Sequence, residues 1–107
     1  MNSSISKDNL SKIILFELNE VPRRLFDYYI DKFPNSSFAR IANEGKVIDT
    51  ITYDDGELHP WSTWPTVHRG VNNSVHNIRY LNQDLTKAKK FKPIWEILIE
   101  NKIDVGI

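Results

Sequence analysis

The chain has 107 residues, of which 40% are hydrophobic and 26% are charged, and 14 basic residues balance 14 acidic ones. This length allows one small domain, and the balanced charge gives no global attraction to nucleic acid or to an anionic membrane. The absence of cysteine excludes a disulfide scaffold, a thiol nucleophile and thiolate metal ligands.

The polar start of the chain, residues 1–11, lacks the apolar core of a signal peptide. No later apolar run is long enough to span a bilayer. We therefore expect a disordered lead-in over 1–11 and a cytoplasmic protein with neither a membrane nor a nucleic-acid polymer as partner. The basic run "KAKKFK" at 87–92 predicts a solvated loop.

The first half of the chain alternates predicted strands and helices. "KIILF" at 12–16 is a continuous apolar run, typical of a strand buried on both faces of a parallel sheet. Apolar spacings of three and four predict an amphipathic helix over 22–33, which begins at a proline. A serine-capped helix ending at Gly45 comes next, and the alternating segment 46–53 predicts a second strand.

The second half of the chain also alternates predicted helices and strands. "WSTWPTVHRG" predicts a helix with Pro65 in an early turn and Gly70 at its end, and 78–81 is compatible with a strand or a loop. Residues 93–101 predict a helix that starts at proline, and "IDVGI" at 103–107 begins a further strand.

This alternation indicates an α/β fold with a mostly parallel sheet. A chain that ends inside a buried type of strand leaves the sheet incomplete, so we expect residues 12–107 to be the N-terminal portion of a larger domain. The alternative is a complete small α/β domain with a short last strand.

Polar side chains follow the first predicted strand at Glu17, Asn19 and Glu20. Ligands bind at the carboxyl ends of strands in open α/β sheets, and hard oxygen ligands suit a divalent metal ion. The alternative is structural, with Asn19 as a helix cap and Glu20 complementing the helix dipole. No glycine follows this strand, which excludes a dinucleotide fingerprint and a P-loop.

The segment 56–70 gathers three hydroxyls, Ser62, Thr63 and Thr66. A hydroxyl near a helix N-terminus can serve as a nucleophile, since backbone N–H groups there stabilise anionic oxygens. The alternative is that Ser62 or Thr63 caps the helix.

Two tryptophans and two histidines flank these hydroxyls. Trp61 and Trp64 are expected either in the core or as substrate-binding walls of the site. His59 and His68 are nine positions apart and share no helical face, so a zinc pair is not expected from them.

Four segments together resemble the alkaline phosphatase superfamily, in its type I phosphodiesterase/nucleotide pyrophosphatase branch. They are "KIILFELNEVP", "FPNSSFARIANEGKVIDT", "STWPTVHRGVNNSVHNI" and "KPIWEILIENKIDVGI". The resemblance covers about residues 12–107 and implies an α/β/α sandwich that holds two divalent metals, zinc or manganese. It also implies that a Thr or Ser forms a covalent ester, which water then hydrolyses.

Carried onto this chain, the resemblance makes Thr63 the leading nucleophile, with Gly70 and His76 at two motif positions. The spacing from Thr63 to Gly70 is about one helical turn shorter than in the family, which leaves Thr66 as the alternative. Asn19 stands where the family has an aspartate ligand, so Glu17 or Glu20 would substitute.

The expected function is metal-dependent hydrolysis of a small-molecule or glycan phosphate or sulfate ester. The chain alone is expected to be inactive without the C-terminal half of the domain. The alternatives are a non-catalytic phospho-ligand-binding descendant and a small α/β interaction module.

Overall fold

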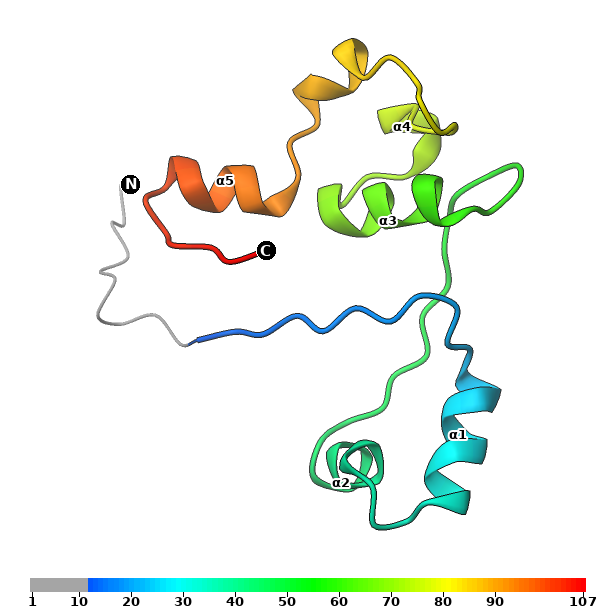
Figure 1. Ribbon diagram of the computed structural model, residues 1–107. Coiled ribbons are helices and arrows are strands. Elements are labelled where there is room, and N and C mark those ends of the chain that lie inside the picture. Colours follow the sequence, from blue (N-terminus) through cyan, green and yellow to red (C-terminus); the bar gives the residue numbers. More distant parts are fainter. Residues whose placement is uncertain (1–11) are drawn as a thin grey trace. The chain divides into compact units, whose positions relative to one another are not determined.

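A computed structural model describes residues 12–107 of the chain (Figure 1). The lead-in predicted for residues 1–11 lies outside these residues. The described part forms two compact units, a first unit of residues 15–51 and a second unit of residues 12–14 and 52–107. The regular elements are α1 (Arg23–Lys32), α2 (Ser37–Glu44), α3 (Pro60–Arg69), α4 (Asn73–His76), the 3₁₀ helix η2 (Thr86–Lys90) and α5 (Ile94–Glu100).

The unit of residues 15–51 is a helical pair. Pro22 precedes α1, and the helix ends at Phe33, just before Pro34. Ser36 caps α2, because its hydroxyl accepts the Ala39 backbone N–H at 3.2 Å. The helices predicted over 22–33 and after the serine pair are therefore confirmed.

Aromatic rings join α1 to α2. The ring of Phe38 meets those of Phe26 and Tyr29 edge-on, with centroids 6.1 and 5.8 Å apart. Edge-to-face contacts of this kind add to the apolar area that the rings bury. Ala39 lies beneath them and is 4% exposed.

Proline and glycine set the bounds of α3 in the second unit. Pro60 is the first residue of the helix, and Gly70 ends it in the left-handed conformation, with φ 69°. Pro65, predicted for an early turn, instead lies inside the helix. It has no N–H to donate to the Trp61 carbonyl four residues earlier, which weakens the helix there.

The remaining helices of this unit are short. The predicted helix 93–101 is confirmed as α5, whereas α4 and η2 have too few residues for a periodic apolar pattern and were not predicted. The ring of His68 on α3 lies 4.9 Å, between centroids, from that of Trp95 on α5. This contact packs the end of α3 against α5.

The predicted α/β sandwich is wrong for the described residues. The segments 12–16, 46–53 and 103–107 are not strands, and the elements from residue 12 to residue 107 are helical. A strand requires a neighbour to pair its backbone N–H and C=O groups, and apolar, β-branched composition does not supply that neighbour. Ile13 and Ile14 are accordingly 88% and 89% exposed rather than buried in a sheet.

Within residues 12–107, no helix is long and apolar enough to cross a membrane.

The Ser36 cap can be tested by substitution. We expect Ser36→Ala to lower the free energy of unfolding by about 1 kcal/mol, because the Ala39 N–H loses its acceptor. Ser37→Ala, at the next and exposed position, is the control and should change it by less than about 0.5 kcal/mol. Urea unfolding followed by circular dichroism measures both, and equal effects would contradict the capping role.

The exposed apolar segment 13–16 should promote self-association, as extended, unpaired apolar backbone does. We expect a variant with Ile14→Lys and Phe16→Lys to show less light scattering than the parent at the same concentration. A variant with Asn35→Lys and Asn43→Lys adds the same charge at exposed polar positions and is the control. The same reduction in both variants would show that charge alone is responsible.

Candidate functional site

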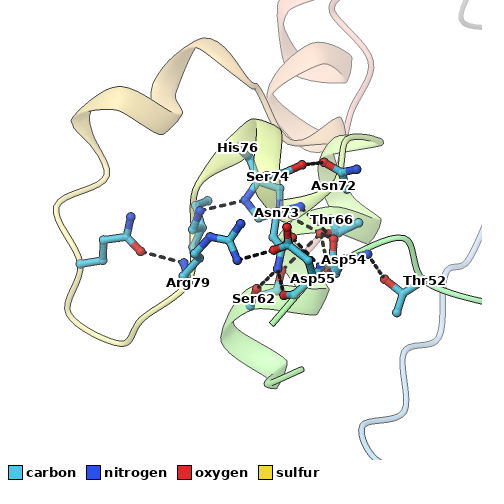
Figure 2. A network of polar contacts seen from close by, with 12 residues as sticks. Thr52, Asp54, Asp55, Ser62, Thr66, Asn72, Asn73, Ser74, His76 and Arg79 are labelled. Atoms are coloured by element: carbon cyan, nitrogen blue, oxygen red, sulfur yellow. Dashed lines mark hydrogen bonds and ion pairs between the residues drawn. The ribbon is translucent and has the colours of Figure 1, made fainter. Parts of the chain in front are cut away.

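The second unit contains a network of polar contacts that meets at the hydroxyl of Thr66 on α3 (Figure 2). Its Oγ1 lies 2.8 Å from both carboxylate oxygens of Asp54 and 2.8 Å from Nε2 of His76. The three residues come from the loop before α3, from α3 itself and from α4. A hydroxyl has one proton and accepts through its lone pairs, so it can donate to one neighbour and accept from the other.

The other nitrogen of His76 determines the direction of these bonds. Nδ1 accepts the backbone N–H of Ile78 at 2.9 Å, so the neutral ring carries its proton on Nε2. Nε2–H therefore donates to Thr66, and the Thr66 hydroxyl donates to Asp54. The carboxylate, rather than the imidazole, is thus the group placed to take the threonine proton.

Asn73 on α4 holds the Asp54–Asp55 loop in place. Its backbone N–H donates to Asp54 Oδ1 at 2.8 Å, and its side-chain amide donates to the Asp55 carbonyl at 2.8 Å. Its Oδ1 accepts the Asp55 N–H at 3.0 Å, and Nδ2 also contacts the Ser62 hydroxyl at 3.3 Å. Asn73 thus joins the loop to α4 and α3 beside the Thr66 hydroxyl.

Three side chains of this network are almost inaccessible to water. Ser62, Asn73 and His76 are each 1% exposed, and Thr66 and Asp54 are half-buried. Burial lowers the pKa of His76, the Asp54 carboxylate acts in the opposite direction, and the positive charges of Arg69 and Arg79 lower it further. His76 is therefore held in its neutral form.

Ser62 also lines an open pocket of about 320 Å³. Its lining residues are Gly56, Glu57, His59, Trp61, Ser62, Arg79, Tyr80 and Leu81, and we call it the indole pocket. The Trp61 ring stacks on His59 at 4.4 Å between centroids, and Arg79 forms an ion pair with Asp55 at 2.7 Å. The pocket thus combines aromatic surface with both hydrogen-bond donors and hydrogen-bond acceptors.

Of the two predicted nucleophiles, the structure brings Thr66 into the network. The Thr63 hydroxyl instead donates to the His59 carbonyl at 3.1 Å, one turn earlier in the chain. His76, predicted only as a motif position, is the direct partner of Thr66, and Gly70 ends α3.

The two tryptophans have different surroundings. Trp61 lines the indole pocket and donates its indole N–H to the Arg79 carbonyl at 3.1 Å. Trp64 stacks with His68 at 5.9 Å between centroids. The structure places Trp61 beside the candidate site, whereas substrate binding by either residue stays a prediction.

The predicted metal ligands Glu17, Asn19 and Glu20 belong to the unit of residues 15–51, whereas Thr63 and Thr66 belong to the other. Glu20 lies in a turn with φ 55° and borders a shallow pocket in its own unit. Among residues 12–107, no three or more His, Asp or Glu side chains are grouped so as to hold a metal ion. The described residues therefore do not provide the ligand set that two zinc or manganese ions require.

Sequence reasoning missed Asp54 and Asn73. The run "DDG" at 54–56 has the composition of a turn, and Asn73 lies 19 positions from Asp54 in a segment with no periodic signal. His59, set aside as a bystander, lines the indole pocket. The one available signal was the clustering of carboxylates and histidines around the hydroxyls of 62–66.

Comparison of the chain with protein-family models, curated proteins and solved structures found no match. Membership of the alkaline phosphatase superfamily therefore stays a prediction that rests on the four quoted segments.

The role of Asn73 can be tested against its neighbour. We expect Asn73→Ala to lower the free energy of unfolding by about 2 kcal/mol, because the buried Asn73 side chain loses its hydrogen bonds to the Asp55 N–H and C=O. Asn72→Ala removes a contact with exposed Ser74 only and should change it by less than about 0.5 kcal/mol. Urea unfolding measures both variants, and an equal loss in Asn72→Ala would contradict the assignment.

Proposed function

We propose that residues 52–107 carry the nucleophile of a site that cleaves phosphate or sulfate esters, with Thr66 as that nucleophile. The supporting observation is the position of Thr66 Oγ1, 2.8 Å from both the Asp54 carboxylate and the His76 Nε2. A nucleophilic hydroxyl needs a base to accept its proton and a donor to stabilise the oxygen that remains.

In the proposed reaction, Asp54 accepts the Thr66 proton as Oγ1 bonds to phosphorus or sulfur. The bond between that atom and the leaving oxygen breaks, and the leaving group departs with the bonding pair. His76 Nε2–H donates to Oγ1 throughout, which lowers the energy of the developing alkoxide. Hydrolysis of the threonine ester by water, which regenerates the hydroxyl, is a second step that we do not expect from this chain alone.

The substrate class, a small-molecule or glycan phosphate or sulfate ester, comes from the sequence resemblance, as does the requirement for zinc or manganese. Since the described residues offer no ligand set, the steps above involve only protein side chains. We expect a single round of transfer to Thr66 without sustained turnover by the 107-residue chain.

A second candidate is a protein that binds a phosphorylated ligand without cleaving it. The ligand class comes from the sequence resemblance, and the observation that favours a non-catalytic role is that the Thr66 hydroxyl already has a donor and an acceptor inside the network. A hydroxyl satisfied in this way stabilises structure and needs no substrate.

The test uses 4-nitrophenyl phosphate and 4-nitrophenyl sulfate, each with and without zinc or manganese. Intact-mass and fragment mass spectrometry should detect one phosphoryl or sulfuryl group on Thr66, with a matching burst of nitrophenolate. Thr66→Ala should abolish the adduct and Thr66→Ser should retain it. Asp54→Asn should slow its formation by about 100-fold or more, because the base is lost.

Thr63→Ala is the matched control and should leave the adduct in place. An adduct on Thr63 would move the nucleophile to that residue. Binding of either ester without an adduct would favour the second candidate. Sustained turnover with added metal would contradict the prediction that this chain alone is inactive.

A further inference from the structure

Residues 79–81 form one wall of the indole pocket, and three side chains hold the segment 78–81 to which they belong. His76 Nδ1 accepts the Ile78 N–H at 2.9 Å, and Trp61 donates its indole N–H to the Arg79 carbonyl at 3.1 Å. Gln83 accepts the N–H groups of Arg79 and Tyr80 at 2.7 and 3.1 Å. Of these three side chains, only that of His76 can change its protonation near neutral pH.

The bond to Ile78 exists only while His76 is neutral. Protonation places a hydrogen on Nδ1, and two N–H donors then face each other across 2.9 Å. His76 is 1% exposed and Ile78 is 6% exposed, so water does not replace the lost acceptor in this arrangement. The segment must move if the ring is to carry charge.

Burial is the main factor that opposes protonation of His76; among the charged groups, Asp54 favours protonation, and Arg69 and Arg79 oppose it. Asp54 faces it from the loop before α3, Arg69 from α3 and Arg79 from the segment itself. Lys87 and Lys90 of η2 line a second pocket together with His76. Arg79 is itself paired with the Asp55 carboxylate at 2.7 Å.

We propose that residues 78–81 are a pH-sensitive wall of the indole pocket and that protonation of His76 releases them. Released, the segment frees the Trp61 indole from the Arg79 carbonyl and opens the pocket that Trp61, Arg79, Tyr80 and Leu81 line. This behaviour does not depend on whether Thr66 reacts.

The direction of the pH dependence follows from the same contacts. Burial lowers the pKa of His76 in the closed arrangement below the value of about 6.5 that an exposed ring has when released. The released form therefore binds its proton first as the pH falls. The closed arrangement, in which residues 78–81 are bound to neutral His76, is fully favoured above about pH 6.5 and is lost progressively below that pH.

The experiment is a titration of the ¹⁵N-labelled 107-residue chain from about pH 8 to pH 5, the range in which histidine changes charge, followed by NMR. The His76 ring, the Ile78 amide and the Trp61 indole N–H should shift with one common midpoint. Amides of α5 that do not contact the segment should not follow it.

Two variants complete the test. His76→Gln cannot titrate here and should abolish the shifts of Ile78 and Trp61. His59→Gln is the matched control, since His59 stacks on Trp61 whereas the Ile78 N–H donates to His76, and should leave the Ile78 transition in place.

The proposal is overturned if the parent's Ile78 amide stays constant while the His76 ring titrates, a result that does not depend on whether His76→Gln folds. It is equally overturned if the Ile78 transition is lost in His59→Gln. A simultaneous change of amides throughout residues 54–101 would show global unfolding instead of a moving wall.

Discussion

The hydrogen bonds of the Thr66 hydroxyl are the constraint on which the second unit depends. Asp54 and His76 reach this one oxygen at 2.8 Å from two different segments of the chain. The loop before α3 and the short helix α4 are therefore both fixed to the middle of α3. Since α4 has only four residues, its position comes from these contacts and not from its own helical stability.

The positions of the protons on His76 and Thr66 affect both the proposed reaction and the fold. The Ile78 N–H donates to Nδ1 of His76. The imidazole therefore donates to Thr66 through Nε2–H and cannot accept the threonine proton. An arrangement in which His76 activates the hydroxyl would need a different tautomer and the loss of a buried backbone bond. The same Ile78–His76 bond that makes Asp54 the acceptor of the Thr66 O–H also connects the ring to the wall of the indole pocket.

The sequence predicted all four of the longer helices of residues 12–107, including α3, because their signals are local. Apolar spacing over 22–33, the serine before α2 and the proline before α5 act within a few residues. The three strands were wrong because a strand's partner is not local, and composition at 12–16 or 46–53 does not provide one. Apolar periodicity is also uninformative for α4, whose inward residues are polar.

The site was partly predicted for the same reason. Thr66 and His76 were selected by their place in a motif, whereas Asp54 and Asn73 became apparent only when contacts 19 positions apart were known. Asp54 belongs to a run with the composition of a turn, and its carboxylate gains a role only from the Asn73 N–H and the Thr66 hydroxyl. Chemistry that depends on such distant pairs cannot be derived from residue types alone.

The most deeply buried side chains of the second unit are polar, which bears on its thermodynamics. Ser62, Asn73 and His76 are 1% exposed, while many of its isoleucines and leucines face solvent. Unfolding such a unit exposes little new apolar area, and exposure of polar groups lowers the heat capacity. Its heat-capacity change on unfolding should therefore be small for its length, and its stability should vary with temperature along a flatter curve than that of a domain with an apolar core.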